Sequence, residues 1–409
     1  MSTTTEFDFP TGVVEPEYDL WADEVDIDPT RIFANLSEAD AQWRQRARDF
    51  VVSEVKPVAH DLWERAEYPL ELVRSMGSAG LLRDGLNFGE HPEMSMLAAG
   101  LVNMEMARGD GSAATILGVQ AGLALRSVLM CGSEEQIARY AEPMSAGTLP
   151  GAFALTEPTH GSDSVSLETR AHRVAGGYVL NGEKKWIGNG SVGGLTVVWA
   201  RDDEGQVRGF LVEQDSPGYQ ATTISNKLSL RAIWQAHIRL ENVFVPDSQV
   251  MPGARSFKDT SKVLFATRLG VAWAAVGHAT ACYESAVLYA KARTQFGRPL
   301  AASQIIQERL ARMQSELATI QLLVMQCGQL EAAGDLTGAQ ASLAKFTATR
   351  TARTIAANAR DLLGGNGILT NNRVARHFAD LEAIHTYEGT ETVQALLIGR
   401  SITGISAFA

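Results

Sequence analysis

The feature that most constrains this chain is a double change of periodicity along its length. Apolar residues recur at helical spacing from about Ser37 to Gly147, alternate in strand fashion from Gly151 to Pro252, and return to helical spacing after Ser256. Helices, then strands, then helices again predict an α+β protein. Because the chain has 409 residues, it is long enough for two or three domains.

We expect an acidic N-terminal arm, a helical domain, a β domain and a C-terminal bundle of helices. In that order, they cover residues 1–30, 31–150, 151–255 and 256–409. The arm is crowded with acids and lacks periodicity, so we interpret it as an extended segment that packs on a neighbouring subunit. Ser37, with Asp40 three residues later, predicts the cap of a first helix that reaches to about Glu54.

The middle block has the alternation of strands at residues 177–182, 195–200 and 209–213. Turn residues are placed at Asn181-Gly182, Glu204-Gly205 and Pro217-Gly218. Gly188–Gly193 matches the pattern G-x-G-x-x-G of dinucleotide-binding turns. Such a turn needs a helix after it, and a strand is expected here instead, so we reject this interpretation.

The last block contains a regular apolar seam. Its members alternate at steps of three and four residues: Leu310, Met313, Leu317, Ile320, Val324 and Cys327. This spacing is typical of a helix in an antiparallel bundle, and we interpret the seam as core rather than as a cofactor site.

Charge and cysteine usage exclude several classes of protein. A net charge of −11 argues against binding to nucleic acid or to an anionic membrane, although a few local arginines could still bind an anionic ligand. Cys131, Cys282 and Cys327 are widely separated, as expected for small buried residues in a reducing compartment, and no metal site is expected. With no signal peptide, no apolar stretch long enough to span a membrane and no peroxisomal ending, we expect a cytoplasmic protein.

Five segments carry more special residues than simple turns need. They are 153–158 with Gly161-Ser162-Asp163 following, 184–189, 293–297, 361–367 and 387–390. Each has an ordinary structural explanation when taken alone. Gly364-Gly365 could cap a helix, Trp186 could be a core aromatic and Arg293 a surface charge.

Together and in this order, the five segments resemble the acyl-CoA dehydrogenase and oxidase superfamily, over about Leu36 to Phe408. The chain resembles glutaryl-CoA dehydrogenases and, more closely, plant peroxisomal short-chain acyl-CoA oxidases. The segments that carry the second likeness are 186–189, 226–228 and 256–262. The resemblance implies an N-terminal α-helical domain, a β-barrel-like middle domain and a C-terminal four-helix bundle, assembled as a homotetramer that binds FAD.

The resemblance also implies two sets of FAD-binding residues. The set on the same subunit is Phe153, Leu155, Thr156, Trp186, Ile187, Gly188, Thr390 and Thr392. The set that reaches the FAD of a neighbouring subunit is Arg293, Gln295, Gln304, Gly364 and Gly365, and Phe296, Asp361 and Leu363 are further residues expected to bind FAD. Arg293 would pair as a cation with the pyrophosphate, and the two glycines would allow close approach of the backbone.

For catalysis, the resemblance makes Glu388 the general base that removes the α proton of an acyl-CoA, while the flavin N5 takes the β hydride. The thioester α proton is weakly acidic, so the carbonyl oxygen needs hydrogen bonds, here from the Glu388 N–H and an FAD ribityl hydroxyl. Arg268 either tunes Glu388 or forms a structural ion pair. The residues expected at the CoA substrate are Ser162, Gly389 and the segment from Ser261 to Arg268. The ordinary alternative for Glu388 is a carboxylate at a helix start.

Two departures from the family pattern bear on substrate and electron acceptor. Leu70 and Ala114 stand where glutaryl-CoA dehydrogenases carry arginine, and a carboxylate buried without a cation is costly, so we expect a short monocarboxylic acyl chain. Gly188 replaces the threonine of most dehydrogenases and matches oxidases, which would open space near the flavin for oxygen. We expect a dehydrogenase that passes electrons to an electron-transfer flavoprotein, with an oxidase or a glutaryl-CoA dehydrogenase as alternatives. Glu388 argues against a silent scaffold and against a flavin monooxygenase.

Overall fold

The computed structural model describes Trp21 and residues 25–407. Most of the acidic arm expected at 1–30 therefore lies outside the described residues, and its packing on a neighbouring subunit is not tested. The end of the arm packs on the protein's own bundle. Val25 and Ile27 contact the bundle core, and the Ile27 carbonyl accepts a hydrogen bond from Gln321 Nε2 at 3.0 Å.

The N-terminal part is helical, as expected. Its helices are α1 (Glu38–Phe50), α2 (Ala59–Arg65), α3 (Leu70–Ser78), α4 (Met96–Gly109), α5 (Gly111–Leu117), α6 (Arg126–Cys131) and α7 (Glu134–Ser145). Ser37 caps α1 by accepting from the Asp40 N–H at 3.1 Å, which confirms the predicted start. A π-helical turn, Val51–Val55, extends α1 to the predicted end near Glu54.

One helical run differs from the sequence-based expectation about membrane spans. α5, the π-helical stretch Gly118–Leu125 and α6 form a run from Gly111 to Cys131 that is long and apolar enough, by length and composition, to cross a membrane. Within the protein, 72% of its apolar window is buried. Burial of that extent is the property of a core helix.

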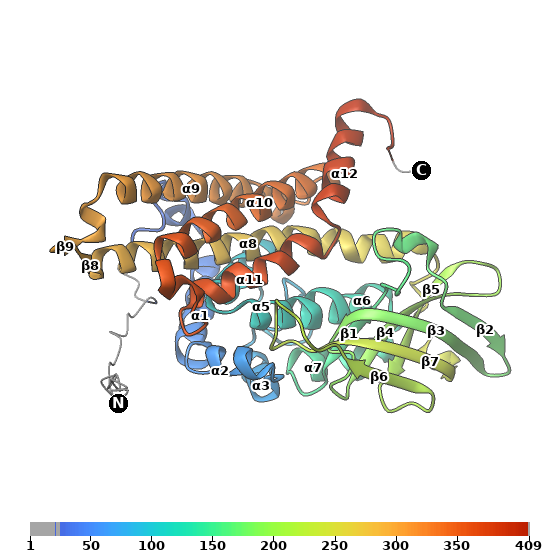
Figure 1. Ribbon diagram of the computed structural model, residues 1–409. Helices are drawn as coiled ribbons and strands as arrows, with labels where there is room; N and C mark the ends of the chain where they lie inside the picture. The colour runs from blue at the N-terminus through green and yellow to red at the C-terminus, as the bar shows by residue number, and fades with distance from the viewer. Residues whose placement is uncertain (1–20, 22–24, 408–409) are drawn as a thin grey trace, which may run out of the picture.

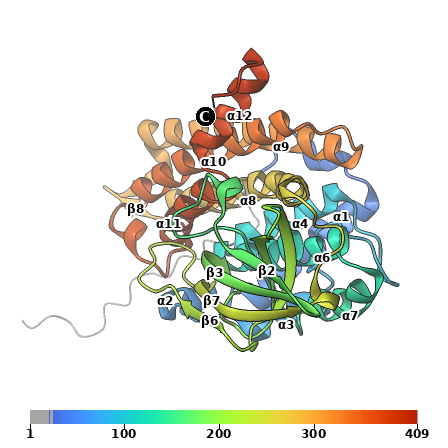
Figure 2. The same ribbon diagram turned by 90° about the vertical axis from the view of Figure 1, so that its right-hand side faces the viewer.

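The middle part forms a curled sheet. Its strands are β1 (Gly151–Ala154), β2 (Arg170–Val174), β3 (Gly177–Gly188), β4 (Leu195–Arg201), β5 (Val207–Glu213), β6 (Tyr219–Thr223) and β7 (Gln235–Pro246). The seven strands run in the order β1-β4-β2-β3-β7-β6, with β5 on the free side of β4. One side of the sheet packs on α6 and α7, and the other side closes around its own core (Figures 1 and 2).

One of the turns predicted in this domain is wrong, and the rejection of a dinucleotide-binding turn is confirmed. Asn181-Gly182 is not a turn: it lies inside β3, where the register against β7 shifts between Leu180 and Gly182. The Asn181 side chain accepts from the Asn242 N–H at 2.9 Å on β7, so strand pairing overrides the turn preference. Gly188–Gly193 leads from β3 into β4, which confirms that it is no dinucleotide-binding turn.

The C-terminal part is a bundle of long helices. They are α8 (Phe257–Ala292), α9 (Gln304–Ala332), α10 (Gly338–Leu362), α11 (Arg373–Thr386) and α12 (Glu391–Thr403), with a short hairpin of β8 (Thr294–Gln295) and β9 (Arg298–Pro299). The predicted α9 seam is buried from Met313 to Cys327, and Leu310 packs at its margin. In Figure 1, α8 runs from the β8–β9 end to the β domain, and α12 projects from the body. The predicted α+β architecture with a helical bundle is confirmed.

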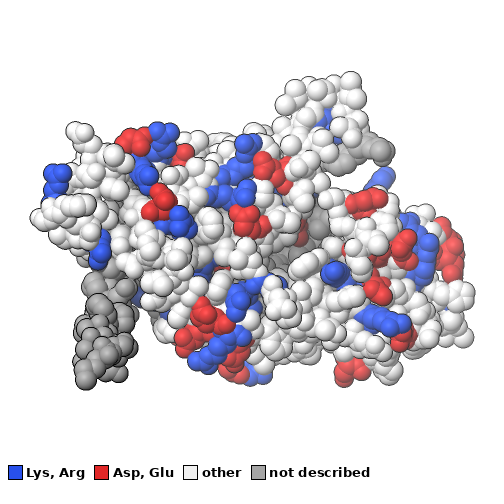
Figure 3. Space-filling view, viewed as in Figure 1, with Lys and Arg blue, Asp and Glu red and all other residues white. Residues whose placement is uncertain are grey.

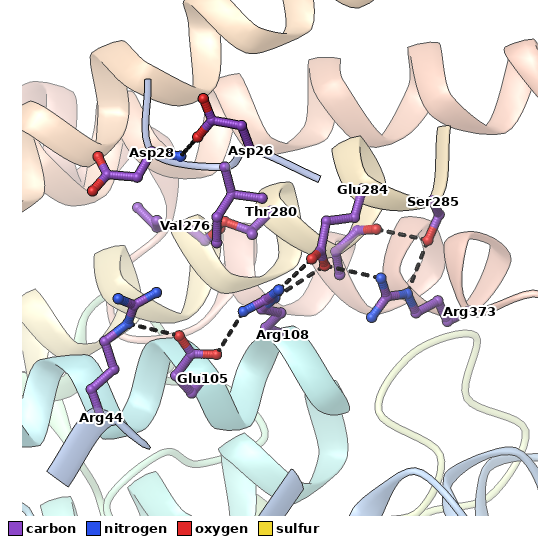
Figure 4. A network of polar contacts seen from close by, with 12 residues as sticks. Asp26, Asp28, Arg44, Glu105, Arg108, Val276, Thr280, Glu284, Ser285 and Arg373 are labelled. Atoms are coloured by element: carbon purple, nitrogen blue, oxygen red, sulfur yellow. Dashed lines mark hydrogen bonds and ion pairs between the residues drawn. The ribbon is translucent and has the colours of Figure 1, made fainter. Parts of the chain in front are cut away.

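A buried chain of ion pairs joins the N-terminal helices to the bundle (Figure 4). Arg44 on α1 pairs with Glu105 on α4 at 2.9 Å, and Glu105 pairs with Arg108 at 3.1 Å. Arg108 then bonds to Glu284 on α8, whose carboxylate also pairs with Arg373 on α11 at 3.0 Å. Because the inner members are almost fully buried, each charge depends on its partners, and the four helices are held in one register.

The surface charges are mixed, and the cysteines are buried. On the face shown in Figure 3, Lys and Arg alternate with Asp and Glu, without an extended basic patch. Cys131, Cys282 and Cys327 are buried and free, as expected for small core residues.

Candidate active site

The predicted site residues meet at a cavity of about 930 Å³, bounded by the N-terminal helices, the β domain and the bundle. The predicted residues that line it are Phe153, Leu155, Thr156, Ser162, Trp186, Ile187, Gly188, Ser261, Arg268, Glu388, Gly389 and Thr390. α8 runs along one wall, and residues from Phe257 to Ala274 reach the cavity. One end of β1, one end of β3 and the α11–α12 connection are thereby brought together.

Glu388 lies in the short connection between α11 and α12, and its backbone is unusual. Its φ is +53°, in the left-handed region that side-chain-bearing residues rarely adopt. Gly389 follows at φ +83°, where a Cβ would stand 2.6 Å from Gln394 Nε2. Such a conformation costs of order 1–3 kcal/mol and persists only where surrounding contacts impose it.

Two buried side chains impose it. Gln394 donates to the carbonyls of both Glu388 and Gly389 at 3.0 Å. The Lys345 ammonium on α10 donates to the carbonyls of Tyr387 and Gly389, one on each side of Glu388. Lys345 is only 1% exposed, and burial lowers its pKa to about 7. The backbone of the candidate base is therefore clamped from the bundle side.

The Glu388 carboxylate is placed by α8. Thr267 Oγ1 donates to Glu388 Oε2 at 3.0 Å. Burial raises the pKa of Glu388 above its ordinary value, while Lys345, the Thr267 hydroxyl and Arg268 act in the opposite direction. Since burial is the largest effect, the site favours a carboxylate that accepts a proton more readily than an exposed glutamate does.

Removing the Thr267 hydroxyl tests this electrostatic balance. In Thr267→Val the pKa of Glu388 rises further, so less of the base is deprotonated at a given pH. We expect the ascending limb of the pH–rate profile to move to higher pH and the rate below that limb to fall by up to about tenfold. Thr260→Val is the control, because Thr260 lies on α8 outside the cavity and its Oγ1 has no hydrogen-bond partner among the described residues. An unmoved limb in Thr267→Val would contradict the assigned contact.

Arg268 also lines the cavity, one residue after Thr267. Its Nη1 donates to Ser342 Oγ at 3.4 Å on α10. Burial lowers the pKa of Arg268 and the charge of Glu388 opposes this. Among the described residues, Arg268 forms no direct ion pair with a carboxylate, which argues against the structural ion pair. Its positive charge instead lowers the pKa of Glu388, as expected if it tunes the base.

The opposite wall is built on a buried ion pair. Lys184 Nζ bonds to Glu157 Oε1 at 2.9 Å and to the Leu155 carbonyl at 3.0 Å, and the Thr156 carbonyl accepts from the Lys185 N–H at 2.9 Å. These contacts join the segment after β1 to β3. Trp186, with φ +66° and 55% exposed, stands where the two meet. The predicted flavin-facing residues thus form one rigid surface.

Several predicted cofactor residues do not reach this cavity. Those expected to serve a neighbouring subunit lie at the other end of the bundle, at the β8–β9 hairpin and after α10, remote from β1–β7 in Figure 1. Phe296 is fully exposed there, whereas Leu363 is buried. Thr392 is exposed and does not line the cavity, and its contact with FAD stays a prediction.

The two positions that argue against a dicarboxylic substrate lie in different places, and only one of them lines the cavity. Ala114 lines the cavity, as expected. Leu70 does not; it starts α3 and packs against the core of the N-terminal helices. Only Ala114 therefore bears on the acyl pocket.

Family models match nearly the whole folded chain. The N-terminal, middle and C-terminal domains of acyl-CoA dehydrogenase match residues 37–148, 152–243 and 257–403. The chain belongs to the acyl-CoA dehydrogenase family. It is therefore an oxidoreductase of a family whose members use FAD, and the fold inferred from the five segments is confirmed. The likeness to plant oxidases is not among these findings.

Individual members of this family are similar to the chain over nearly their whole length. The short-chain specific acyl-CoA dehydrogenase of Rattus norvegicus mitochondria is 33% identical over 372 residues, covering 89% of this chain and 90% of that protein. The structure of glutaryl-CoA dehydrogenase from Mycobacterium smegmatis superimposes with a TM-score of 0.91 at 39% identity, covering 94% of this chain and 99% of that one. A structure of a glutaryl-CoA dehydrogenase from the same organism in complex with FADH2 has a TM-score of 0.91 at 35% identity, covering 93% and 98%.

The cavity fits the flavin of this family. Its lining is mainly apolar, and Thr156, Ser162 and Lys227 add polar groups at the wall formed by the β domain. Gly188 lines this cavity. A Cβ there would lie 3.0 Å from Val119 Cγ2 and 3.2 Å from Ile233 Cδ1, so these two side chains limit the space on one side of the glycine. The expectation that Gly188 opens a space beside the ring stays a prediction.

Proposed function

We propose that this protein oxidises a short-chain monocarboxylic acyl-CoA to the trans-2-enoyl-CoA and passes the electrons to an electron-transfer flavoprotein. Glu388 removes the α proton, and FAD, when bound, supplies the acceptor for the β hydride. The observation that carries this proposal is the arrangement of Glu388 at the cavity that the residues expected to hold the flavin also line: Lys345 clamps its backbone and Thr267 holds its carboxylate.

The chain's own groups account for the proton transfer. Burial prepares the carboxylate to accept a proton, and Thr267 fixes its orientation. Within Trp21 and residues 25–407, the Glu388 N–H donates to no protein acceptor, so it is available to the thioester oxygen. A backbone donor held in place before the reaction stabilises the charge that develops on that oxygen.

Two observations support the choice of substrate and acceptor. Ala114 offers no cation to a distal carboxylate at the cavity wall. Val119 and Ile233 limit the space on one side of Gly188, which favours an electron-transfer flavoprotein over oxygen. We further propose a homotetramer, because the β8–β9 hairpin, which the resemblance assigns to the FAD of a neighbouring subunit, lies at the end of the bundle remote from the cavity.

Comparing butyryl-CoA with glutaryl-CoA tests the substrate proposal. Under anaerobic conditions, we expect butyryl-CoA to bleach the flavin absorbance at least about a hundredfold faster, since an unpaired buried carboxylate costs several kcal/mol. Equal rates would contradict the proposed substrate class. In the same experiment oxygen is then admitted, and rapid re-oxidation of the product-bound enzyme would show an oxidase instead.

A further inference from the structure

The connection between β6 and β7 forms one wall of the cavity. Residues 224–229 of this connection line the cavity, and each of them keeps accessible surface; Leu228 is 67% exposed. Pairing of β6 with β7 ends at Thr223 and Ala236, so the sheet does not hold this wall. Contacts outside the sheet must therefore fix its position relative to Glu388.

Leu230, directly after the wall, has an unusual backbone. Its φ is +49°, in the left-handed region that bulky side chains rarely adopt, and the residue is 1% exposed. Its carbonyl accepts from Lys227 Nζ at 2.7 Å. Such a conformation persists only where surrounding contacts impose it. Leu230 therefore marks the point at which the wall is anchored.

The anchor is a buried carboxylate on α11. Asp380 Oδ1 accepts from the Leu230 N–H at 2.6 Å and from Trp63 Nε1 at 3.1 Å. One residue earlier on α11, the Ala379 carbonyl accepts from Ser229 Oγ at 2.6 Å. Two neighbouring residues of the helix thus bind two neighbouring residues of the connection, which fixes the wall along the axis of α11.

The same helix leads to the candidate base. Ile384, one turn beyond Asp380, lines the cavity, and Glu388 follows directly after the end of the helix and its cap. A helix rises about 1.5 Å per residue, so the anchor lies about 9 Å along the axis from the end of α11. On the other side, Ile233 Cδ1 lies 3.2 Å from the position of a Cβ on Gly188, which is expected at the flavin. Asp380 therefore links the flavin side of the cavity to the helix that carries the base.

We propose that Asp380 is a positioning residue of the reaction, which sets the distance between the wall at 224–229 and Glu388. This inference rests on the proposed acyl-CoA oxidation. Asp380 does not line the cavity, so it acts through the backbone of Leu230. Proton and hydride transfer depend on the distances between the reacting groups, and a displacement of about 1 Å can lower a rate about a hundredfold.

This role requires an acceptor oxygen rather than a charge. Burial and the charge of Asp110 raise the pKa of Asp380 to about 7, and in either protonation state the Oδ1 atom can accept from the Leu230 N–H. Asparagine has the same shape and keeps this acceptor. Alanine would leave the N–H groups of Leu230 and Trp63 buried without this partner, which is unfavourable. The two substitutions therefore separate positioning from charge.

The test compares Asp380→Ala with Asp380→Asn in the FAD-loaded protein. With butyryl-CoA under anaerobic conditions, Asp380→Ala should slow flavin reduction at saturating substrate by at least about tenfold. The Kd of butyryl-CoA should stay within a few-fold, because the residues expected at CoA lie on other elements. Asp380→Asn should keep the rate within a few-fold of the parent protein. A defect in folding alone would lower the yield of FAD-loaded protein and not the rate per bound flavin.

His377→Leu is the matched control. His377 also lies on α11, is 2% exposed, contacts His278 through the two Nδ1 atoms at 2.8 Å and does not line the cavity. Like Asp380→Ala, it should melt at lower temperature, because it removes a buried polar contact. It should keep the parent rate per bound flavin.

Hydrogen–deuterium exchange tests the anchor without the reaction. The backbone amides of residues 226–234 should exchange at least about tenfold faster in Asp380→Ala than in the parent protein. In Asp380→Asn and His377→Leu they should exchange at the parent rate.

Unchanged exchange or an unchanged rate in Asp380→Ala, or an equal loss of rate in Asp380→Asn or His377→Leu, would overturn the inference while leaving acyl-CoA oxidation intact. Failure of every acyl-CoA to reduce the flavin of the parent protein would instead reject the proposed function, and this inference with it.

Discussion

Glu388→Gln is expected to retain FAD and to bind acyl-CoA, and to lose flavin reduction by about 10²–10⁴-fold, the contribution typical of a general base. The amide keeps the volume of the side chain and can still accept from Thr267 Oγ1, so the connection between α11 and α12 keeps its shape. It cannot take up the α proton. Stopped-flow measurement of flavin bleaching by butyryl-CoA, with binding measured separately, checks both halves of this expectation.

The matched control is Glu391→Gln. Glu391 is three residues away, half-buried, and paired with Arg350 at 3.2 Å and with His385 at 2.9 Å, but it does not line the cavity. We expect its rate to stay within a few-fold of the parent protein. If Glu388→Gln reduced the flavin within tenfold of the parent rate, Glu388 would not be the base.

Lys345→Met should lower flavin reduction by about a hundredfold without removing the base itself. Hydrogen bonds from a charged group contribute about 1.5–3 kcal/mol each, and Lys345 makes two, to the carbonyls on either side of Glu388. Without them, nothing on the α10 side holds the left-handed backbone of Glu388. The charge of Lys345 also lowers the pKa of Glu388, so in the variant the ascending limb of the pH–rate profile moves to higher pH.

Lys227→Met separates this positioning role from general loss of stability. Lys227 also lines the cavity and donates to the carbonyls of Leu230 and Ile233 at 2.7 and 2.6 Å, and burial lowers its pKa to about 8. Both variants should melt at lower temperature, and only Lys345→Met should move the ascending limb. A limb unchanged in Lys345→Met, or displaced equally in both variants, would be incompatible with a clamp on Glu388.

The order of domains could be predicted from the sequence because periodicity depends on which face of each element is buried. The α9 seam shows this: its spacing alone predicts the buried face that Met313 and Val324 occupy. Asn181-Gly182 shows the limit. A local turn preference was overridden by pairing with Asn242, some sixty residues later in the chain, which no local pattern reveals.

Site residues could be predicted from the sequence only where they belong to a short motif that resembles a known family. Glu388, Trp186 and Thr156 lie in such motifs and do meet at one cavity. Lys345 lies in none, yet it had a signal: it falls on the face of α10 that also carries the buried Ala341, Ala348 and Ala352, where a charge needs a reason. The sequence therefore contained one signal for Lys345: a lysine on the apolar face of a helix predicts that the lysine is buried against a polar group.

Other parts of the site depend on packing between distant segments. Val119 packs against Gly188 from a distant part of the chain, and α4, α8 and α9 all contribute residues to the cavity wall. Thr267 was expected within a CoA-binding segment, whereas its hydroxyl contacts the base. The residues around the β8–β9 hairpin lie away from the cavity of their own subunit, because the FAD that they are predicted to contact belongs to a neighbouring subunit.

The most direct test of the central claim isolates proton removal from hydride transfer. An acyl-CoA with sulfur in place of the β carbon, 3-thiabutyryl-CoA, has no β hydrogen to give, but its α protons can still exchange with deuterium oxide. Followed by NMR with the FAD-loaded protein, exchange should be catalysed by the parent enzyme and slowed by at least about a hundredfold in Glu388→Gln. Equal exchange by the two proteins would contradict the assignment of Glu388 as the α-proton base.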